Sequence, residues 1–131
     1  MNGLLLDTHI WFWYLVGSSK LPPRIKSSLD SSPDPFWLSP ISVWELSMLA
    51  RRGRIEMKSY CRSWVTMAFS KLPVKEAPIN VEVSLKSQEI QFDHKDPADH
   101  FLAATALVYD LMLVTVDRRL IGLKWLQTFS G

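Results

Sequence analysis

The chain has 131 residues, of which 47% are hydrophobic and 21% are charged. This length and composition are typical of one globular domain and exclude a disordered chain. The formal net charge of +2 is too small to argue for nucleic-acid binding by itself. The single cysteine, Cys61, excludes an internal disulfide and a cysteine-based zinc site, and it fits a reducing compartment.

The apolar start of the chain, "LLLDTHIWFWYLV" at residues 4–16, is interpreted as buried core. It has no basic leader, it carries Asp7 and His9, and it is shorter than the roughly 18 to 20 residues that span a bilayer. We therefore expect a cytoplasmic protein with no membrane segment.

Predicted strands and helices alternate along the chain. Leu4–Leu6 predicts a buried strand that ends at Asp7. Helices are then expected at 8–16 and 22–29, a strand at 36–40, helices at 42–51, 60–70, 81–90 and 99–109, an extended segment around Lys75, and strands at 111–117 and 126–129. This alternation predicts a single domain over 1–131 of the α/β class, a three-layer α/β/α sandwich with a central parallel sheet.

Two helix starts have recognisable capping patterns. Ser42 and Glu45 have the capping-box spacing, which predicts Ser42 as the N-cap of the helix over 42–51. Pro97 suits a first helical position, which makes Asp96 the expected N-cap there. Asp99 then lies in the first turn, where the helix dipole is expected to stabilise its ionised form while its side chain faces the cleft.

Four acids stand at predicted strand ends or helix starts, namely Asp7, Glu45, Asp99 and Asp117. Because the carboxyl ends of parallel strands share one edge, these carboxylates are expected to converge. Clustered carboxylates raise one another's pKa unless a cation sits among them, and Mg²⁺ or Mn²⁺ prefers such oxygen ligands. The set therefore predicts a metal site for phosphoryl chemistry on nucleic acid.

Each acid also has a simpler structural explanation. Asp7 could only cap the following helix, and Glu45 could only complete the capping box. Asp117 could pair with Arg118 or Arg119. The prediction of a metal site therefore depends on the set and on no single member.

Four segments resemble a known family: "LLLDTH", "SPISVWEL", "DPADHFLAATA" and "LVTVD". In this order and separation they resemble the PIN domain, and specifically the VapC toxins of bacterial toxin–antitoxin pairs. The resemblance implies an Mg²⁺- or Mn²⁺-dependent endoribonuclease that cleaves RNA with a metal-activated water and inhibits translation. It also implies a homodimer that is held inactive by a VapB-like antitoxin, whose tail lies over the acidic site.

The resemblance also implies roles for particular residues. Asp7 and Asp99 would be the principal metal ligands, and Glu45 and Asp117 would complete the catalytic pocket directly or through water. Thr8 and Ser42 would orient carboxylates or waters. His100 stands where many relatives have an arginine, so RNA contact or pH dependence is expected to differ.

The nearest basic groups in sequence are candidates for RNA contact: Arg51, Arg52, Arg54, Arg118 and Arg119, together with His100. Phosphate contacts of this kind supply affinity more than specificity. A solvated surface explains the first cluster equally well. The tryptophans Trp11, Trp13, Trp44 and Trp64 are expected in the core or at an interface, with base stacking as the less favoured interpretation.

Two other functions are alternatives to a ribonuclease. A haloacid-dehalogenase-like phosphatase needs a second acid two residues after its first aspartate, and this chain has His9 there. A non-catalytic domain that uses the acidic pocket for regulation stays possible, although the presence of all four acids argues against it.

Overall fold

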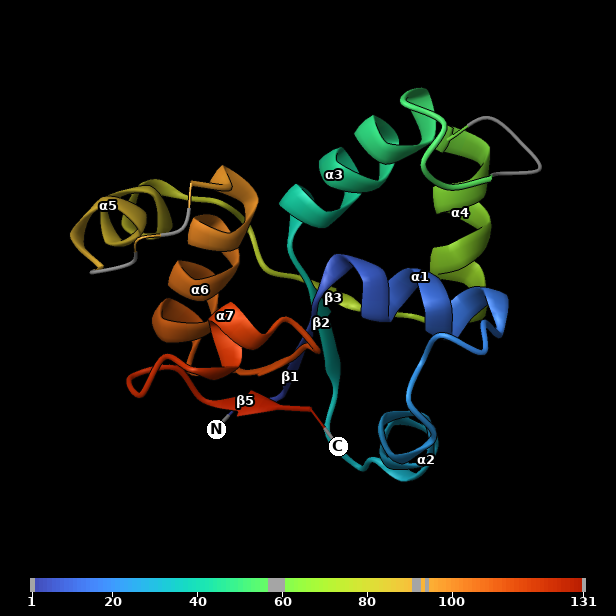
Figure 1. Ribbon diagram of the computed structural model, residues 1–131, viewed down its shortest axis with the longest axis horizontal. Coiled ribbons are helices and arrows are strands. Elements are labelled where there is room, and N and C mark those ends of the chain that lie inside the picture. Colours follow the sequence, from blue (N-terminus) through green and yellow to red (C-terminus); the bar gives the residue numbers. More distant parts are fainter. Residues whose placement is uncertain (1, 57–60, 91–92, 94, 131) are drawn as a thin grey trace.

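A parallel sheet stands at the centre of the molecule (Figure 1). The computed structural model describes residues 2–56, 61–90, 93 and 95–130, and within them the sheet has five strands in the order β3-β2-β1-β4-β5. The strands are β1 (Leu4–Leu6), β2 (Phe36–Leu38), β3 (Lys75–Glu76), β4 (Met112–Val114) and β5 (Thr128–Phe129). All neighbouring strands pair in parallel, which confirms the predicted sheet.

Helices connect and cover these strands. They are α1 (Thr8–Val16), α2 (Pro23–Ser31), α3 (Pro40–Arg51), α4 (Cys61–Lys71), α5 (Val81–Glu89), α6 (Pro97–Tyr109) and α7 (Arg118–Ile121). The predicted start of α4 at Tyr60 lies outside the described residues. The sequence did not predict α7, because four residues are too few to show helical periodicity. None of the described helices has the length and apolar character needed to cross a lipid bilayer.

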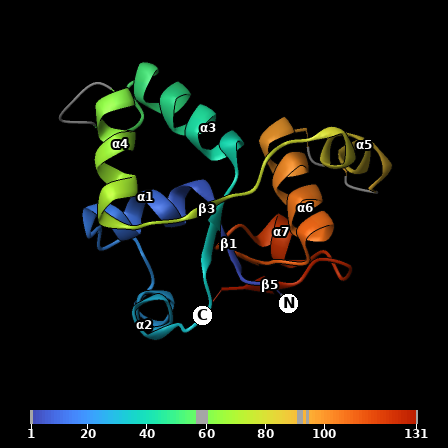
Figure 2. The same ribbon diagram turned by 180° about the vertical axis from the view of Figure 1, so that it is seen from behind.

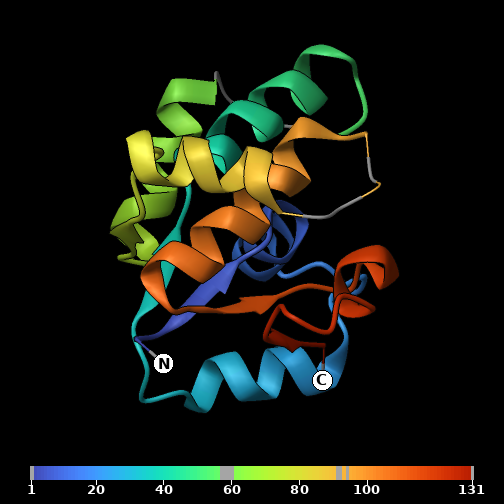
Figure 3. The same cartoon turned by 90° about the vertical axis from the view of Figure 1, so that its left-hand side faces the viewer.

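The alternating side chains of β1 divide the core into two clusters. Leu4 and Leu6 join a cluster that includes Trp11 of α1 and Trp64 of α4. Leu5 points to the opposite face and packs with residues of α6 and α7. Figure 3 shows the sheet between α2 and α6, and Figures 1 and 2 show α5 on the outer side of α6. The predicted α/β/α sandwich is therefore confirmed.

The start of α3 differs from the prediction. Its N-cap is Ser39, whose hydroxyl accepts a hydrogen bond from the Ile41 N–H at 3.1 Å. Pro40 takes the first helical position, where no amide hydrogen is needed. The predicted N-cap at Ser42 and its capping box with Glu45 are therefore wrong, because both residues lie inside the helix. The helix start does not need the Glu45 carboxylate.

The start of α6 agrees with the prediction for its cap. Asp96 accepts a hydrogen bond from the Ala98 N–H at 3.0 Å, and Pro97 is the first helical residue. The cap thus confirms Pro97 as the first helical residue, and it places the helix start two residues before the range 99–109 that the apolar pattern predicted. Most strands are shorter than predicted, since the strand expected over 111–117 pairs only at Met112–Val114 before the backbone turns into the cap of α7.

Gly3 is required where the chain enters β1. Its φ is +154°, and a Cβ atom there would lie 2.8 Å from the Pro35 carbonyl oxygen and 2.8 Å from the Trp37 ring. We expect Gly3→Ala to lower the free energy of unfolding by about 1 to 3 kcal/mol, measured by urea denaturation. The control is Gly17→Asn, because Gly17 has open space around it and Asn tolerates its left-handed conformation. Equal losses in the two variants would contradict a role for close packing at Gly3.

Candidate active site

A pocket of about 250 Å³ lies at the carboxyl edge of the sheet. It adjoins the ends of β1 and β4, the neighbouring strands between which the strand order reverses. Parallel α/β sheets bind ligands at such switch points. The acids that line it are Asp7, Glu45, Asp96, Asp99 and Asp117. The structure therefore brings the four predicted acids together, adds Asp96 to them, and defines what we term the acidic pocket.

Asp7 has both carboxylate oxygens held in place. It caps α1, and its Oδ1 accepts a hydrogen bond from the Thr8 N–H at 2.7 Å. Its Oδ2 accepts a hydrogen bond from the Thr115 hydroxyl at 2.7 Å. Burial raises the pKa of Asp7 and the charge of Asp117 adds to this, while the two hydrogen bonds and His9 oppose it. The Asp7 carboxylate is thus oriented before any ligand binds.

Thr115 was not among the site residues predicted from the sequence. Its side chain is fully buried just after β4. Its hydroxyl donates to Asp7 and accepts a hydrogen bond from the Asp117 N–H at 3.0 Å. Thr115 therefore couples the ends of β1 and β4 and positions two acids. The available signal was a hydroxyl residue two positions before the strand-terminal Asp117.

Thr8 and Ser42 join α1, which follows Asp7, and α3, which carries Glu45, by a hydrogen bond. The Thr8 hydroxyl donates to the Ser42 hydroxyl at 3.0 Å, and both side chains are fully buried. This bond ties the first turn of α1 to the first turn of α3, one turn before Glu45. Partial burial raises the pKa of Glu45, the charges of Asp7 and Asp96 add to it, and the nearby Thr8 opposes it.

Asp99 is buried in the first turn of α6, with only 6% of its surface exposed. Burial raises its pKa to about 7, and the charges of Asp96, Asp7, Asp117 and Glu45 add to the shift. The helix dipole favours the ionised form, as the position in the first turn predicts, but its contribution of about 0.3 to 1 kcal/mol is smaller than the effect of burial among other carboxylates. The pKa of Asp99 is therefore raised on balance.

Asp117 has a structural partner as well as a place in the pocket. It caps α7 by accepting a hydrogen bond from the Arg119 N–H at 2.9 Å, and its Oδ2 lies 3.2 Å from an Arg119 guanidinium nitrogen. The alternative that paired Asp117 with Arg119 is therefore correct. Arg119 also lines the acidic pocket, so the ion pair places one positive charge at its rim.

The other predicted RNA contacts lie outside the acidic pocket. Arg118 is exposed on α7, and Arg54 is exposed after α3. His100 lies in a different groove, beside Lys95 and Phe101. Arg51 and Arg52 line a third groove along α3.

The tryptophans divide into buried and exposed side chains. Trp11 and Trp64 lie in the core, where their rings meet edge to face at 5.3 Å. Trp13 forms part of the apolar wall of the acidic pocket, with its ring 5.4 Å from that of His9. Trp44 is 53% exposed, so of its two expected positions, in the core or at an interface, the core position is excluded. The buried residues of α3 are Ser42 and Leu46 instead.

The chemistry of the acidic pocket suits a hard divalent cation. Its ligating atoms are carboxylate oxygens, with one imidazole at the wall and no thiol. No three such groups among the described residues are close enough together to hold an ion as they stand. A small cation that keeps several of its waters fits this arrangement, with some carboxylates reached through water.

The fold and the pocket define an α/β/α domain that collects carboxylates at the switch point of a parallel sheet. Comparison with known families gives a match to the PIN domain over residues 4–126. The chain belongs to the PIN domain family.

Individual relatives agree with this assignment. Ribonuclease VapC22 of Mycobacterium tuberculosis is 28% identical over 120 residues, which cover 92% of this chain and 91% of that protein. The structure of VapBC2 from Rickettsia felis bound to a promoter DNA fragment has a TM-score of 0.69 and 16% identity, covering 96% of both chains. FitAcB from Neisseria gonorrhoeae has a TM-score of 0.71 and 19% identity, covering 97% of this chain and 96% of that one. The similarity to these two structures concerns the fold.

The raised pKa of Asp99 predicts a dependence of stability on pH. Because the folded protein binds this proton more tightly than the unfolded chain, protonation of Asp99 stabilises the fold below about pH 4. The contribution, at most about 4 kcal/mol, is lost as the pH rises towards 7. In metal-free buffer, urea denaturation between about pH 5 and pH 8 should therefore show a steeper fall in stability for the wild type than for Asp99→Asn.

The matched control is Asp34→Asn, which changes an exposed carboxylate in the turn before β2. Its stability should follow the wild-type pH dependence. Parallel curves for the wild type and Asp99→Asn would mean that Asp99 does not hold its proton in this range.

Proposed function

We propose that this protein is a divalent-metal-dependent endoribonuclease that acts as the toxin of a VapBC-type pair and inhibits translation by cleaving RNA. The observation that carries the proposal is the convergence of five carboxylates at the switch point of a PIN domain. The 28% identity to a protein named as a ribonuclease supports the choice of RNA as substrate. We also propose that residues 1–131 form a single domain.

In this proposal the acids coordinate Mg²⁺ or Mn²⁺ in two ways, directly or through water. Asp7 and Asp99 would be the direct ligands, and Glu45 and Asp117 would contribute directly or through water. When bound, such a cation supplies polarisation of a phosphodiester and activation of a water nucleophile. The buried hydroxyls of Thr115 and Thr8 would keep the acids from rearranging, because each joins two segments that carry one.

Electrostatics explains why the cation would be needed before RNA can bind. Five carboxylates around one pocket repel a phosphodiester. Burial raises the pKa values of Asp7, Glu45 and Asp99, and repulsion from neighbouring carboxylates adds to each shift. Arg119 supplies a positive charge at the rim, but it is paired with Asp117. A divalent cation would reverse the local charge where the scissile phosphate has to lie.

We further propose a VapB-like antitoxin as the partner and a homodimer as the assembly. The solved relatives include complexes described as VapBC and FitAcB. A cationic antitoxin side chain would complement the acidic pocket by charge and exclude the substrate. We expect the protein to act in the cytoplasm, where its RNA substrate is found.

The first test is metal-dependent cleavage of RNA. Purified protein should cleave total RNA when Mg²⁺ or Mn²⁺ is present and should not cleave it in EDTA. Asp7→Asn and Asp99→Asn should abolish cleavage, because each removes a negative oxygen ligand. Cleavage products are followed on denaturing gels, with Asp34→Asn as a variant that keeps its activity. Equal cleavage by the wild type and both pocket variants would indicate a contaminating nuclease and reject the assignment.

A second test separates the two aspartates of α6. Ser is itself a good N-cap, so Asp96→Ser should keep the helix start and reduce the cleavage rate by less than Asp99→Asn. We expect a loss below about 10-fold for Asp96→Ser and above about 100-fold for Asp99→Asn, measured as kcat/KM on one RNA. Comparable losses would show that Asp96 also acts on the metal or the substrate.

A further inference from the structure

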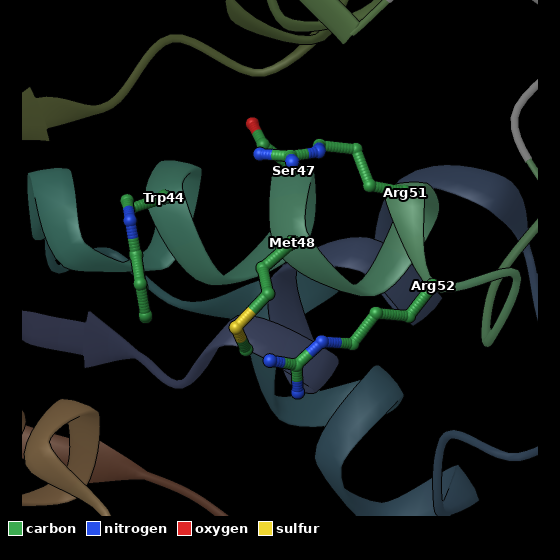
Figure 4. Close-up of a pocket in the computed structure, with 5 residues that line it drawn as sticks. All are labelled: Trp44, Ser47, Met48, Arg51 and Arg52. Carbon is green, nitrogen blue, oxygen red and sulfur yellow. The ribbon is translucent and has the colours of Figure 1, made fainter.

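A groove on the outer side of α3 has no role in the proposed chemistry. It has a volume of about 360 Å³ and is lined by Trp44, Ser47, Met48, Arg51 and Arg52 (Figure 4). All five residues belong to α3 or follow it directly. We term this feature the α3 groove.

The helical spacing arranges these side chains in two rows. Trp44, Met48 and Arg52 are four residues apart, so they form one ridge along the helix. Figure 4 shows Trp44 and Arg52 extending on the same side of α3, with Met48 between them. Ser47 and Arg51 form the neighbouring row. The groove thus combines an aromatic ring, a thioether and two guanidinium groups over two turns.

Hydrogen bonds fix the base of the groove. The Ser47 hydroxyl donates to the Val43 carbonyl at 2.9 Å, and its oxygen lies 2.8 Å from the Cys61 thiol of α4. Because the hydroxyl hydrogen is used on Val43, the thiol acts as the donor to Ser47. This contact joins α3 to α4, so the position of Ser47 in the groove is fixed by packing between these two helices.

The groove is positively charged. Arg51 and Arg52 are exposed, and in the described parts of the chain neither guanidinium takes part in an ion pair. Arg54 follows two positions later and is also exposed. Guanidinium groups in this state suit the planar oxygens of phosphate, and they stack on flat rings as well.

The α3 groove begins next to the acidic pocket. Trp44 and Glu45 are consecutive residues, and Glu45 lines the acidic pocket. With a rise of about 1.5 Å per residue, Arg51 lies about 9 Å further along the helix than Glu45. A strand whose phosphate lies in the acidic pocket could therefore continue along α3.

We propose that the α3 groove binds an unpaired nucleotide of the RNA substrate that neighbours the cleaved bond. Its base stacks on Trp44 beside Met48, and the adjoining phosphates contact Arg51 and Arg52. A half-exposed indole next to exposed guanidinium groups is the combination to which single-stranded nucleic acid binds, because every base has a face that can stack. This inference rests on the proposed function, since it takes RNA as the substrate.

The test measures binding separately from cleavage. In an Asp99→Asn background that cannot cleave, fluorescence anisotropy gives the Kd for a fluorescein-labelled single-stranded oligoadenylate in Mg²⁺. We expect Trp44→Ala to raise this Kd by about tenfold, and Trp44→Phe to restore most of the affinity. Replacing both Arg51 and Arg52 by Gln should lower the slope of log Kd against log salt by about 1.4, or about 0.7 for each lost phosphate contact.

Trp125→Ala and Arg24→Gln are matched controls, because Trp125 is also exposed and Arg24 lies on α2, away from α3 (Figure 1). Circular dichroism checks that every variant is folded. A Kd for Trp44→Ala equal to that of the Trp125→Ala control would overturn the proposal. Unchanged RNA affinity with reduced binding of poly-glutamate would also overturn it and would assign the groove to an acidic protein partner.

The same groove variants, made in the protein that keeps Asp99, distinguish failure of the groove proposal from failure of the proposed ribonuclease function. If the wild type cleaves RNA and Trp44→Ala has an unchanged KM, only the groove proposal fails. If the wild type does not cleave RNA in Mg²⁺ or Mn²⁺, the proposed function fails, whatever the groove binds.

Discussion

The hydrogen bond from Thr115 to Asp7 is the interaction on which the acidic pocket most depends. It joins the ends of the neighbouring strands β1 and β4, and the same hydroxyl accepts a hydrogen bond from the Asp117 N–H. A hydrogen bond to an ionised carboxylate is stronger than a neutral one, and burial makes it costly to lose. Carboxylates that repel one another would otherwise turn towards water. Thr115 therefore keeps mutually repelling groups at one edge of the sheet.

Three aspartates both cap helices and line the acidic pocket. Asp7, Asp96 and Asp117 are the N-caps of α1, α6 and α7, and each also lines the acidic pocket. The amino ends of these helices carry partial positive charge, which partly offsets the negative charge of the acids. A structural explanation and a functional one are thus compatible for each of these aspartates, because a cap uses only part of the hydrogen-bonding capacity of a carboxylate.

Helix α3 carries residues of both the acidic pocket and the α3 groove. Its first turn is tied to α1 through Ser42, its second carries Glu45, and its outer side carries the α3 groove. One rigid helix therefore sets the distance between the acids and the exposed Trp44. Substrate positioning would then depend on packing between helices α1, α3 and α4 and not on a mobile loop.

The sequence by itself determined the α/β class, the convergence of four acids and the cap at Asp96. Those features depend on local patterns, namely buried runs that end in an acid and a proline after an aspartate. The cap of α3 at Ser39 is also local, because it rests on the Ile41 N–H two residues away and on Pro40, the same signal as at Asp96. Only the tertiary structure decided that Thr115 links two acids, that burial outweighs the helix dipole at Asp99 and that Trp44 is exposed. Each of these three depends on contacts and burial between segments that are distant in sequence, and neither spacing nor periodicity along the chain contains that information.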